Sequence, residues 1–84
     1  MNTTEILTSN LAARVDEIVG YQINIDNFRL AVAKIAKEHT GESVLDLAMQ
    51  EFARQLEESM QQNIIEQRKA MIIHDVIADQ LAES

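Results

Sequence analysis

The stretch from Val44 to Leu81 contains neither glycine nor proline, and it constrains the fold more than any other feature of the sequence. It is rich in Ala, Leu, Glu, Gln and Met, which favour helix intrinsically. Its apolar residues recur at nearly the 3.6-residue period of an α-helix. The stripe consists of Leu45, Met49, Phe52, Leu56, Met60, Ile64, Met71 and Leu81, with Gln67 or Arg68, His74 and Ala78 at intermediate steps. Because a helix of about forty residues is about 60 Å long, it must lie along something equally long.

The first half of the chain predicts that long partner. Its apolar stripe also has a helical period, with a polar or small opposite face. The stripe consists of Leu7, Leu11, Val15, Ile18, Ile25, Phe28, Val32 and Ile35, with Gln22 in the one vacant step. We therefore expect a helix over residues 4–39.

The segment GYQINIDN, residues 20–27, fits more than one backbone conformation. Tyr21, Ile23 and Ile25 alternate with polar residues as in a strand, but no other segment alternates to pair with them. Gly20 could also close one helix, with Asn24 or Asp26 capping the next. Since the apolar stripe keeps the same phase on both sides, we predict one helix running through, with Gly20 as its weakest point at a cost of about 1 kcal/mol.

The segment HTGES predicts a tight turn between the two helices. Lys34, Lys37 and His39 place cationic groups at the negative end of the first helix, and Gly41 is suited to the left-handed conformation that ends a helix. Ser43 then has the position of an N-cap, with Asp46 as its capping-box acid. We expect the turn at residues 40–43 and the second helix at about 44–82.

These elements define the fold class as all-α: a single domain over residues 1–84, folded as a long antiparallel helical hairpin. A chain of 84 residues without cysteines has a small core and no disulfides, so oligomerisation is the remaining source of stability. The apolar face broadens beyond one stripe at Ile72, Ile73, Val76, Ile77 and Leu81. We read these residues as a homodimer surface that forms a four-helix bundle or a coiled-coil-like assembly. The alternative is a break at Gln61–Asn63 and a compact monomer of three or four helices.

No motif for catalysis, a metal or a cofactor is recognisable. Neither His39 nor His74 has a carboxylate or a second histidine three or four residues away on its own helix, and the Glu-x-x-His pattern of di-iron bundles is missing. Glu57, Glu58 and Glu66 read as a solvated acidic edge that a partner protein could contact, and not as an acid–base pair. We therefore expect no catalytic residues, no metal, no cofactor and no enzyme activity.

The charge balance argues against direct nucleic-acid binding. Seven basic and 14 acidic residues give a net charge of −7, which repels phosphate. In the segment that would be a recognition helix, Asp46 and Glu51 stand against a single Arg54. An acidic inhibitor that imitates DNA is an alternative function that fits this charge.

A second alternative rests on the segment GESVLDLAMQEF. It resembles the part of acyl carrier proteins where a serine at the start of a helix receives a phosphopantetheine arm. The resemblance implies attachment at Ser43, with apolar Val44, Leu47 and Met49 in the matching places. The family's usual aspartate before the serine is Glu42 here, and its acidic residue five positions later is Ala48.

The N-terminus shows no signal-peptide pattern, and no apolar run is long enough to cross a membrane. We therefore expect a cytoplasmic protein without membrane contact. The sequence favours a non-enzymatic interaction or regulatory protein, of the kind found as bacterial or phage accessory proteins, that forms a homodimer and occupies the surface of another protein.

Overall fold

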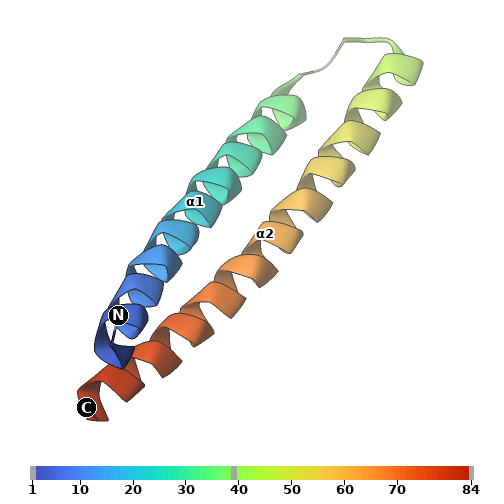
Figure 1. The fold of residues 1–84 in the computed structure, drawn as a ribbon. Helices are drawn as coiled ribbons and strands as arrows, with labels where there is room; N and C mark the ends of the chain where they lie inside the picture. The colour runs from blue at the N-terminus through green and yellow to red at the C-terminus, as the bar shows by residue number, and fades with distance from the viewer. Residues whose placement is uncertain (1, 39, 84) are drawn as a thin grey trace.

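The computed structural model describes residues 2–38 and 40–83, and it consists of two long helices. α1 spans Thr3–Lys37 (35 residues) and α2 spans Ser43–Glu83 (41 residues). They lie side by side and antiparallel, with both chain termini at the end opposite the turn (Figure 1). The molecule measures 63 × 17 × 14 Å. The predicted all-α hairpin is confirmed, and each helix begins and ends within two residues of the expected position.

α1 continues through residues 20–27 without a break, as the phase of its apolar stripe predicted. Asn2 caps its first turn, because the Asn2 Oδ1 accepts a hydrogen bond from the Glu5 N–H at 2.8 Å. Gly20 lies inside the helix, and a Cβ built there meets no atom within 4 Å. The strand and the helix break at this segment are therefore both wrong.

α2 is also continuous through Gln61–Asn63, so the chain does not fold back into three or four shorter helices. Nothing in the composition of this helix interrupts its hydrogen-bond ladder, since its 41 residues include neither glycine nor proline. The compact alternative is therefore wrong, and the hairpin extends over the full length of the two helices.

The turn is built differently from the capping pattern that the sequence suggested. α1 ends at the extended residue Glu38, and Gly41 has a φ of 79° within the turn rather than at the helix end. Ser43 is already the first residue of α2. The Asp46 Oδ1 accepts hydrogen bonds from the Thr40 N–H at 3.1 Å and from the Thr40 Oγ1 at 2.8 Å, so Asp46 ties the turn to the first turn of α2. His39 lies outside the described residues.

The seam, meaning the positions at which each helix faces the other, follows alternating steps of three and four residues. In α1 these buried or half-buried positions are Leu7, Leu11, Arg14, Ile18, Tyr21, Ile25, Phe28, Val32 and Ile35. In α2 they are Asp46, Met49, Ala53, Leu56, Met60, Asn63, Gln67, Ala70, His74, Ile77 and Leu81. A repeat averaging 3.5 residues is that of a left-handed coiled coil.

The predicted stripes differ from the seam at several steps. Val15 and Phe52 are 44% and 53% exposed, and Met71 is 41% exposed, so all three lie outside the seam. Arg14 takes the step assigned to Val15, and Ala53 takes that of Phe52. The sequence reasoning chose the more apolar of two adjacent residues, whereas a seam also accepts small residues and long side chains whose polar ends reach water.

Polar side chains join the helices halfway along the hairpin. The Gln67 Nε2 donates hydrogen bonds to the Ile18 carbonyl oxygen at 3.1 Å and to the Gln22 Oε1 at 3.0 Å. The Asn24 Nδ2 donates to the Asn63 Oδ1 at 3.1 Å. Residues 18–24 of α1 are therefore level with residues 63–67 of α2. We call these four amide side chains the polar layer.

Candidate interaction surface

The hairpin encloses very little core. Among the described residues, Ile25 and Ala70 are the buried apolar residues, each 2% exposed, and Gln67 is the buried polar residue. The chain exposes 6221 Å² of solvent-accessible surface. A compact folded chain of 9.5 kDa exposes about 5,000 Å², so the excess is about 1,200 Å². Its radius of gyration is 19.0 Å, whereas a compact domain of this length has about 12 Å.

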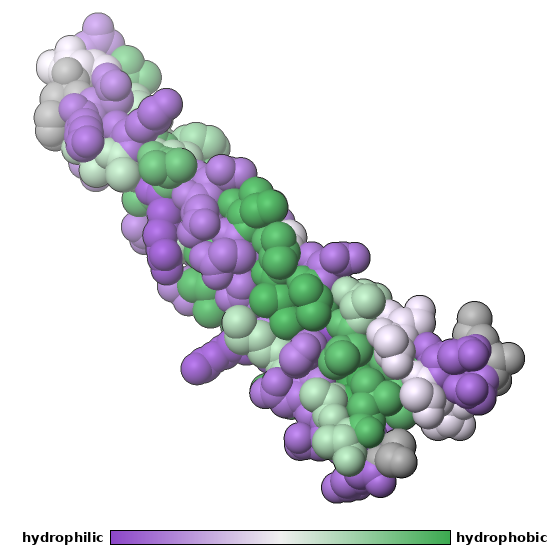
Figure 2. All heavy atoms as spheres, turned by 90° about the vertical axis from the view of Figure 1, so that its left-hand side faces the viewer, coloured by the Kyte–Doolittle hydropathy of each residue, from purple (hydrophilic) through white to green (hydrophobic). Residues whose placement is uncertain are grey.

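Much of the exposed surface is apolar. Among the residues that the structure describes, large hydrophobic side chains are exposed at 14 positions: Ile6, Val15, Val19, Ile23, Leu30, Val44, Leu45, Leu47, Phe52, Ile65, Met71, Ile72, Ile73 and Val76. Figure 2 shows apolar side chains gathered into a band along the side that it views, over the middle of the hairpin and the end where the termini lie. Apolar surface that gathers in this way is typical of interaction sites.

On α2 three exposed residues share the face that points away from α1. Ile65, Ile72 and Val76 are 52%, 64% and 53% exposed and are spaced by seven and four residues, so they lie on one side of the helix. Ile72 is two residues from both Ala70 and His74 of the seam, which places it about 200° around the helix from them. No described residue of α1 covers this face, since its three side chains are all more than half exposed.

The five residues that the sequence predicted as a dimer surface do not all lie on the same side of α2. Ile72, Ile73 and Val76 are exposed and available to a partner. Ile77 and Leu81 are half-buried seam positions that face α1. Their assignment to a dimer surface stays a prediction, but within one chain they already contribute to the packing of α1 on α2.

α1 adds exposed apolar residues at the same level of the hairpin. Val15, Val19 and Ile23 are 44%, 52% and 55% exposed, and the hydrogen bond from Gln67 to the Ile18 carbonyl places this part of α1 beside the middle of α2. We refer to these exposed residues on the outer sides of the two helices, Val15, Val19 and Ile23 of α1 and Ile65, Ile72 and Val76 of α2, as the terminal-half surface. It belongs to the half of the hairpin that carries the termini (Figure 1).

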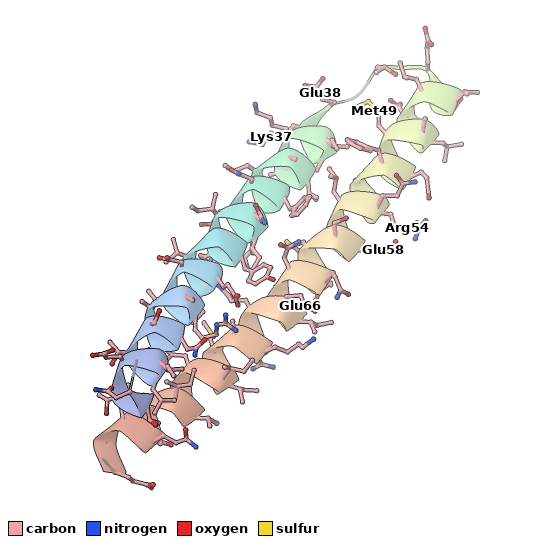
Figure 3. The ribbon with its side chains drawn as sticks, in the orientation of Figure 1. Lys37, Glu38, Met49, Arg54, Glu58 and Glu66 are labelled. Atoms are coloured by element: carbon pink, nitrogen blue, oxygen red, sulfur yellow. The ribbon has the colours of Figure 1, made fainter. Side chains whose placement is uncertain are left out.

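The predicted acidic edge of Glu57, Glu58 and Glu66 belongs to α2 and is partly neutralised by ion pairs. Figure 3 labels Glu58 and Glu66 on this helix. Glu58 forms an ion pair with Arg54, and the Lys69 Nζ lies 3.3 Å from the Glu66 Oε1. Glu57 makes no ion pair within the described part of the chain. Of the three carboxylates, Glu57 is therefore the one left to attract a cationic partner.

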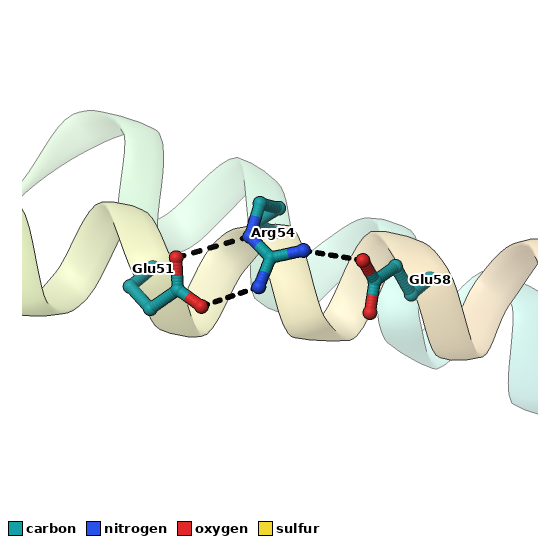
Figure 4. A network of polar contacts seen from close by, with 3 residues as sticks. All are labelled: Glu51, Arg54 and Glu58. Carbon is teal, nitrogen blue, oxygen red and sulfur yellow. Dashed lines mark hydrogen bonds and ion pairs between the residues drawn. The ribbon is translucent and has the colours of Figure 1, made fainter.

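Arg54 forms a fork with two carboxylates of its own helix (Figure 4). Its Nε donates a hydrogen bond to the Glu51 Oε2 at 3.0 Å, and its Nη1 donates to the Glu58 Oε1. The hydrogen bond from Arg54 holds the pKa of Glu51 below its ordinary value, and the hydrogen bond to Glu51 raises the pKa of Arg54. All three side chains are exposed, so this cluster organises charge on the surface and forms no enclosed site.

A groove of about 290 Å³ lies between the helices near the turn. Its lining comes from both helices: Val32, Ile35, Ala36 and Glu38 from the end of α1, and Asp46, Met49, Gln50, Ala53 and Glu57 from the start of α2. Five of the lining residues are apolar, and we call these five the floor of the groove; three others are carboxylates. We call this feature the turn-end groove. Sequence reasoning missed it because Ala36 and Ala53 are small, and small residues leave no signal of the space they create.

Of the other candidate residues, the structure describes His74 and Ser43. Within the described part of the chain, no group of three or more His, Cys, Asp and Glu side chains is placed to hold a metal ion. The His74 Nδ1 lies 3.2 Å from the Asp75 Oδ1 of its own helix. Ser43 is exposed in the first turn of α2. No described helix combines the length and apolar character needed to cross a membrane.

Comparison with known proteins yields no relative for this chain: no protein family, curated protein or solved structure matches it.

Proposed function

We propose that the protein is a non-enzymatic, cytoplasmic interaction protein that forms a homodimer and occupies the surface of another protein. One observation carries this proposal. The isolated hairpin exposes 14 large apolar side chains but buries only two apolar residues in its described part. A second copy supplies the apolar neighbour that these side chains lack.

The surface area agrees with the size of a stable dimer. An excess of about 1,200 Å² per chain is about 2,400 Å² for two chains. Permanent homodimer interfaces bury about 2,000–5,000 Å² in total. Ile65, Ile72 and Val76 lie on the side of α2 that points away from α1, so two hairpins packed with α2 against α2 form a four-helix assembly in that half.

The test is a substitution that charges the centre of this surface. Ile72→Lys places a cation on a residue that is 64% exposed in the single hairpin, so it leaves the fold of one chain intact. The lysine ammonium group would lose its water in the dimer, so we expect the dissociation constant of the dimer to rise at least about tenfold. Gln62→Lys is the matched control, because Gln62 is an exposed polar residue of the same helix.

The measurement is sedimentation equilibrium on the two variants and the unmodified chain. The proposal is supported if Ile72→Lys shifts the equilibrium towards the monomer while Gln62→Lys keeps the dissociation constant of the unmodified chain. Equal behaviour of the two variants excludes the terminal-half surface as the dimer interface. Circular dichroism of each variant confirms that both remain helical.

A further inference from the structure

The turn-end groove is the strongest feature that the proposed dimer leaves unused. Its lining residues fall at 32–38 and 46–57, whereas the terminal-half surface is made by residues 15–23 and 65–76. A dimer packed on the terminal-half surface therefore leaves the groove open at the far end of each hairpin. We propose that the turn-end groove binds a cationic amphipathic helix of a partner protein, an inference that rests on the proposed function and names the chemistry of the partner.

The shape of the groove favours a helix as its occupant. The groove lies between two helices that separate towards the turn (Figure 1), and its floor consists of Val32, Ile35, Ala36, Met49 and Ala53. At about 290 Å³ it is at the low end of ligand-pocket volumes, about 300–1,000 Å³. It therefore has room for a few apolar side chains from one face of a helix, which is how amphipathic helices bind in apolar grooves.

The charge of the groove selects a cationic partner. Glu38, Asp46 and Glu57 are among its nine lining residues, and no basic residue lines it in the described part of the chain. The C-terminal end of α1, which is the negative end of its helix dipole, lies at the same place. Lysine and arginine side chains can lay their apolar stems over the groove and bring their charged ends to these carboxylates.

Nearby basic residues do not remove this preference. Lys34 and Lys37 belong to the last turn of α1, but neither lines the groove. Asp46 accepts a hydrogen bond from the Thr40 Oγ1 at 2.8 Å, and a neutral hydroxyl leaves the net charge of this region unchanged. Glu57 makes no ion pair within the described residues, so its charge is available to a partner.

A second copy of the chain is a poor occupant for the same reason. The chain carries a net charge of −7, so a second copy brings like charge to the acidic side of the groove. Facing like charges across an interface opposes association. The apolar floor and the acidic surround are instead complementary to a helix with one apolar and one basic face.

The probe is a synthetic helical peptide of about 18 residues in which leucines recur at i, i+3, i+4 and i+7 and lysines fill the other positions. Its control has glutamate in place of lysine. Binding is measured by titration into the full chain labelled with nitrogen-15. We expect amide shifts from the lysine peptide concentrated at residues 32–38 and 46–57, and at least about tenfold weaker binding of the glutamate peptide.

Matched variants locate the site. Ala36→Lys places bulk and positive charge in the groove, whereas Ala33→Lys makes the same change on an exposed position of α1 that does not line it. Both residues are exposed, so both variants are expected to fold. The lysine peptide should bind Ala36→Lys at least about tenfold more weakly and Ala33→Lys within about twofold of the unmodified chain.

A second pair removes charge instead of adding bulk. Glu57→Gln changes a lining residue, and Glu58→Gln changes its neighbour, which does not line the groove. We expect a loss of affinity for Glu57→Gln of about threefold at about 0.05 M salt that shrinks at about 0.5 M, and a smaller loss for Glu58→Gln. The proposal would be overturned if, in each pair, the lining variant and its control lost the same affinity for the lysine peptide.

Sedimentation of the same samples separates this inference from the proposed function. A chain that is a dimer but shows no preference for the lysine peptide overturns the groove proposal and leaves the dimer intact. A chain that is a monomer and still binds the peptide at the groove supports the groove and overturns the dimer. If Ala36→Lys weakens the dimer as strongly as Ile72→Lys, the occupant is a second copy, and the groove proposal is overturned.

Discussion

Gln67 of α2 is joined to Gln22 of α1 by a hydrogen bond of 3.0 Å from the Gln67 Nε2 to the Gln22 Oε1. Gln67 is one of the three most buried described residues of the hairpin, at 8% exposed. A polar residue at a seam position lowers coiled-coil stability but fixes which residues face each other. We therefore expect the polar layer to set the antiparallel register of the seam.

Replacing Gln67 by leucine is expected to change the stability of the hairpin and the uniqueness of its register in opposite directions. Gln67→Leu adds apolar contact at a buried site, while Gln22 can turn to water, so we expect the free energy of unfolding to rise by about 1 kcal/mol. We also expect more than one register, seen as doubled amide signals in nuclear magnetic resonance spectra. Gln62→Leu, at an exposed position, should change neither property. A clear loss of stability in Gln67→Leu would show that the hydrogen bonds contribute more than the added burial.

Ile25 is the most buried large side chain, and its removal tests where the core lies. Ile25→Ala should lower the free energy of unfolding by about 3 kcal/mol, because it deletes buried methyl groups and leaves a cavity. Leu30→Ala removes a side chain of similar size from the same helix at a position that is 65% exposed, and should cost less than about 1 kcal/mol. Urea denaturation of the two variants measures both values, and similar losses would contradict the seam described above.

The two glycines are expected to respond to alanine in opposite directions. Gly20 is inside α1 with open space around a built Cβ, so Gly20→Ala should stabilise the hairpin by about 1 kcal/mol through helix preference. Gly41 has a φ of 79°, and Gly41→Ala should destabilise it by about 1 kcal/mol because L residues avoid this conformation. Thermal unfolding followed by circular dichroism measures both effects. A loss of stability in Gly20→Ala would indicate a kink that glycine permits.

The Arg54 fork predicts how Glu51 titrates. The hydrogen bond from Arg54 keeps the pKa of Glu51 below its ordinary value of 4.5. This contact is fully formed above that value and is lost as the pH falls through the lowered pKa. Arg54→Gln should raise the pKa of Glu51 towards 4.5, and Arg68→Gln should leave it unchanged. The carbon-13 shift of the Glu51 carboxyl followed against pH decides between these outcomes, and an unchanged pKa in Arg54→Gln would exclude Arg54 as the cause.

The sequence predicted the hairpin because its strongest signals are local. The scarcity of glycine and proline, together with the helical period on both sides of Gly20, was sufficient to place two continuous helices. The seam was less predictable. Three seam positions hold the polar residues Arg14, Asn63 and Gln67. A pattern of apolar residues does not predict them, because it contains no information on hydrogen bonds to a helix that is distant in the sequence.

The candidate surfaces were also only partly predictable from local sequence patterns. The exposure of Ile72, Ile73 and Val76 agrees with the breadth of the apolar face at this point of the sequence. Ile77 and Leu81 looked equivalent to them, yet the register of the hairpin turns these two residues towards α1. The turn-end groove depends on how far the helices separate near the turn, and no short-range pattern encodes that distance.

The native mass of the unmodified chain tests the central claim most directly. Light scattering coupled to size-exclusion chromatography over a dilution series should give twice the 9.5 kDa of one chain, falling towards one chain only at the lowest concentrations. A mass of one chain at every concentration, with the 19.0 Å radius of gyration of the single hairpin, would contradict the proposed homodimer.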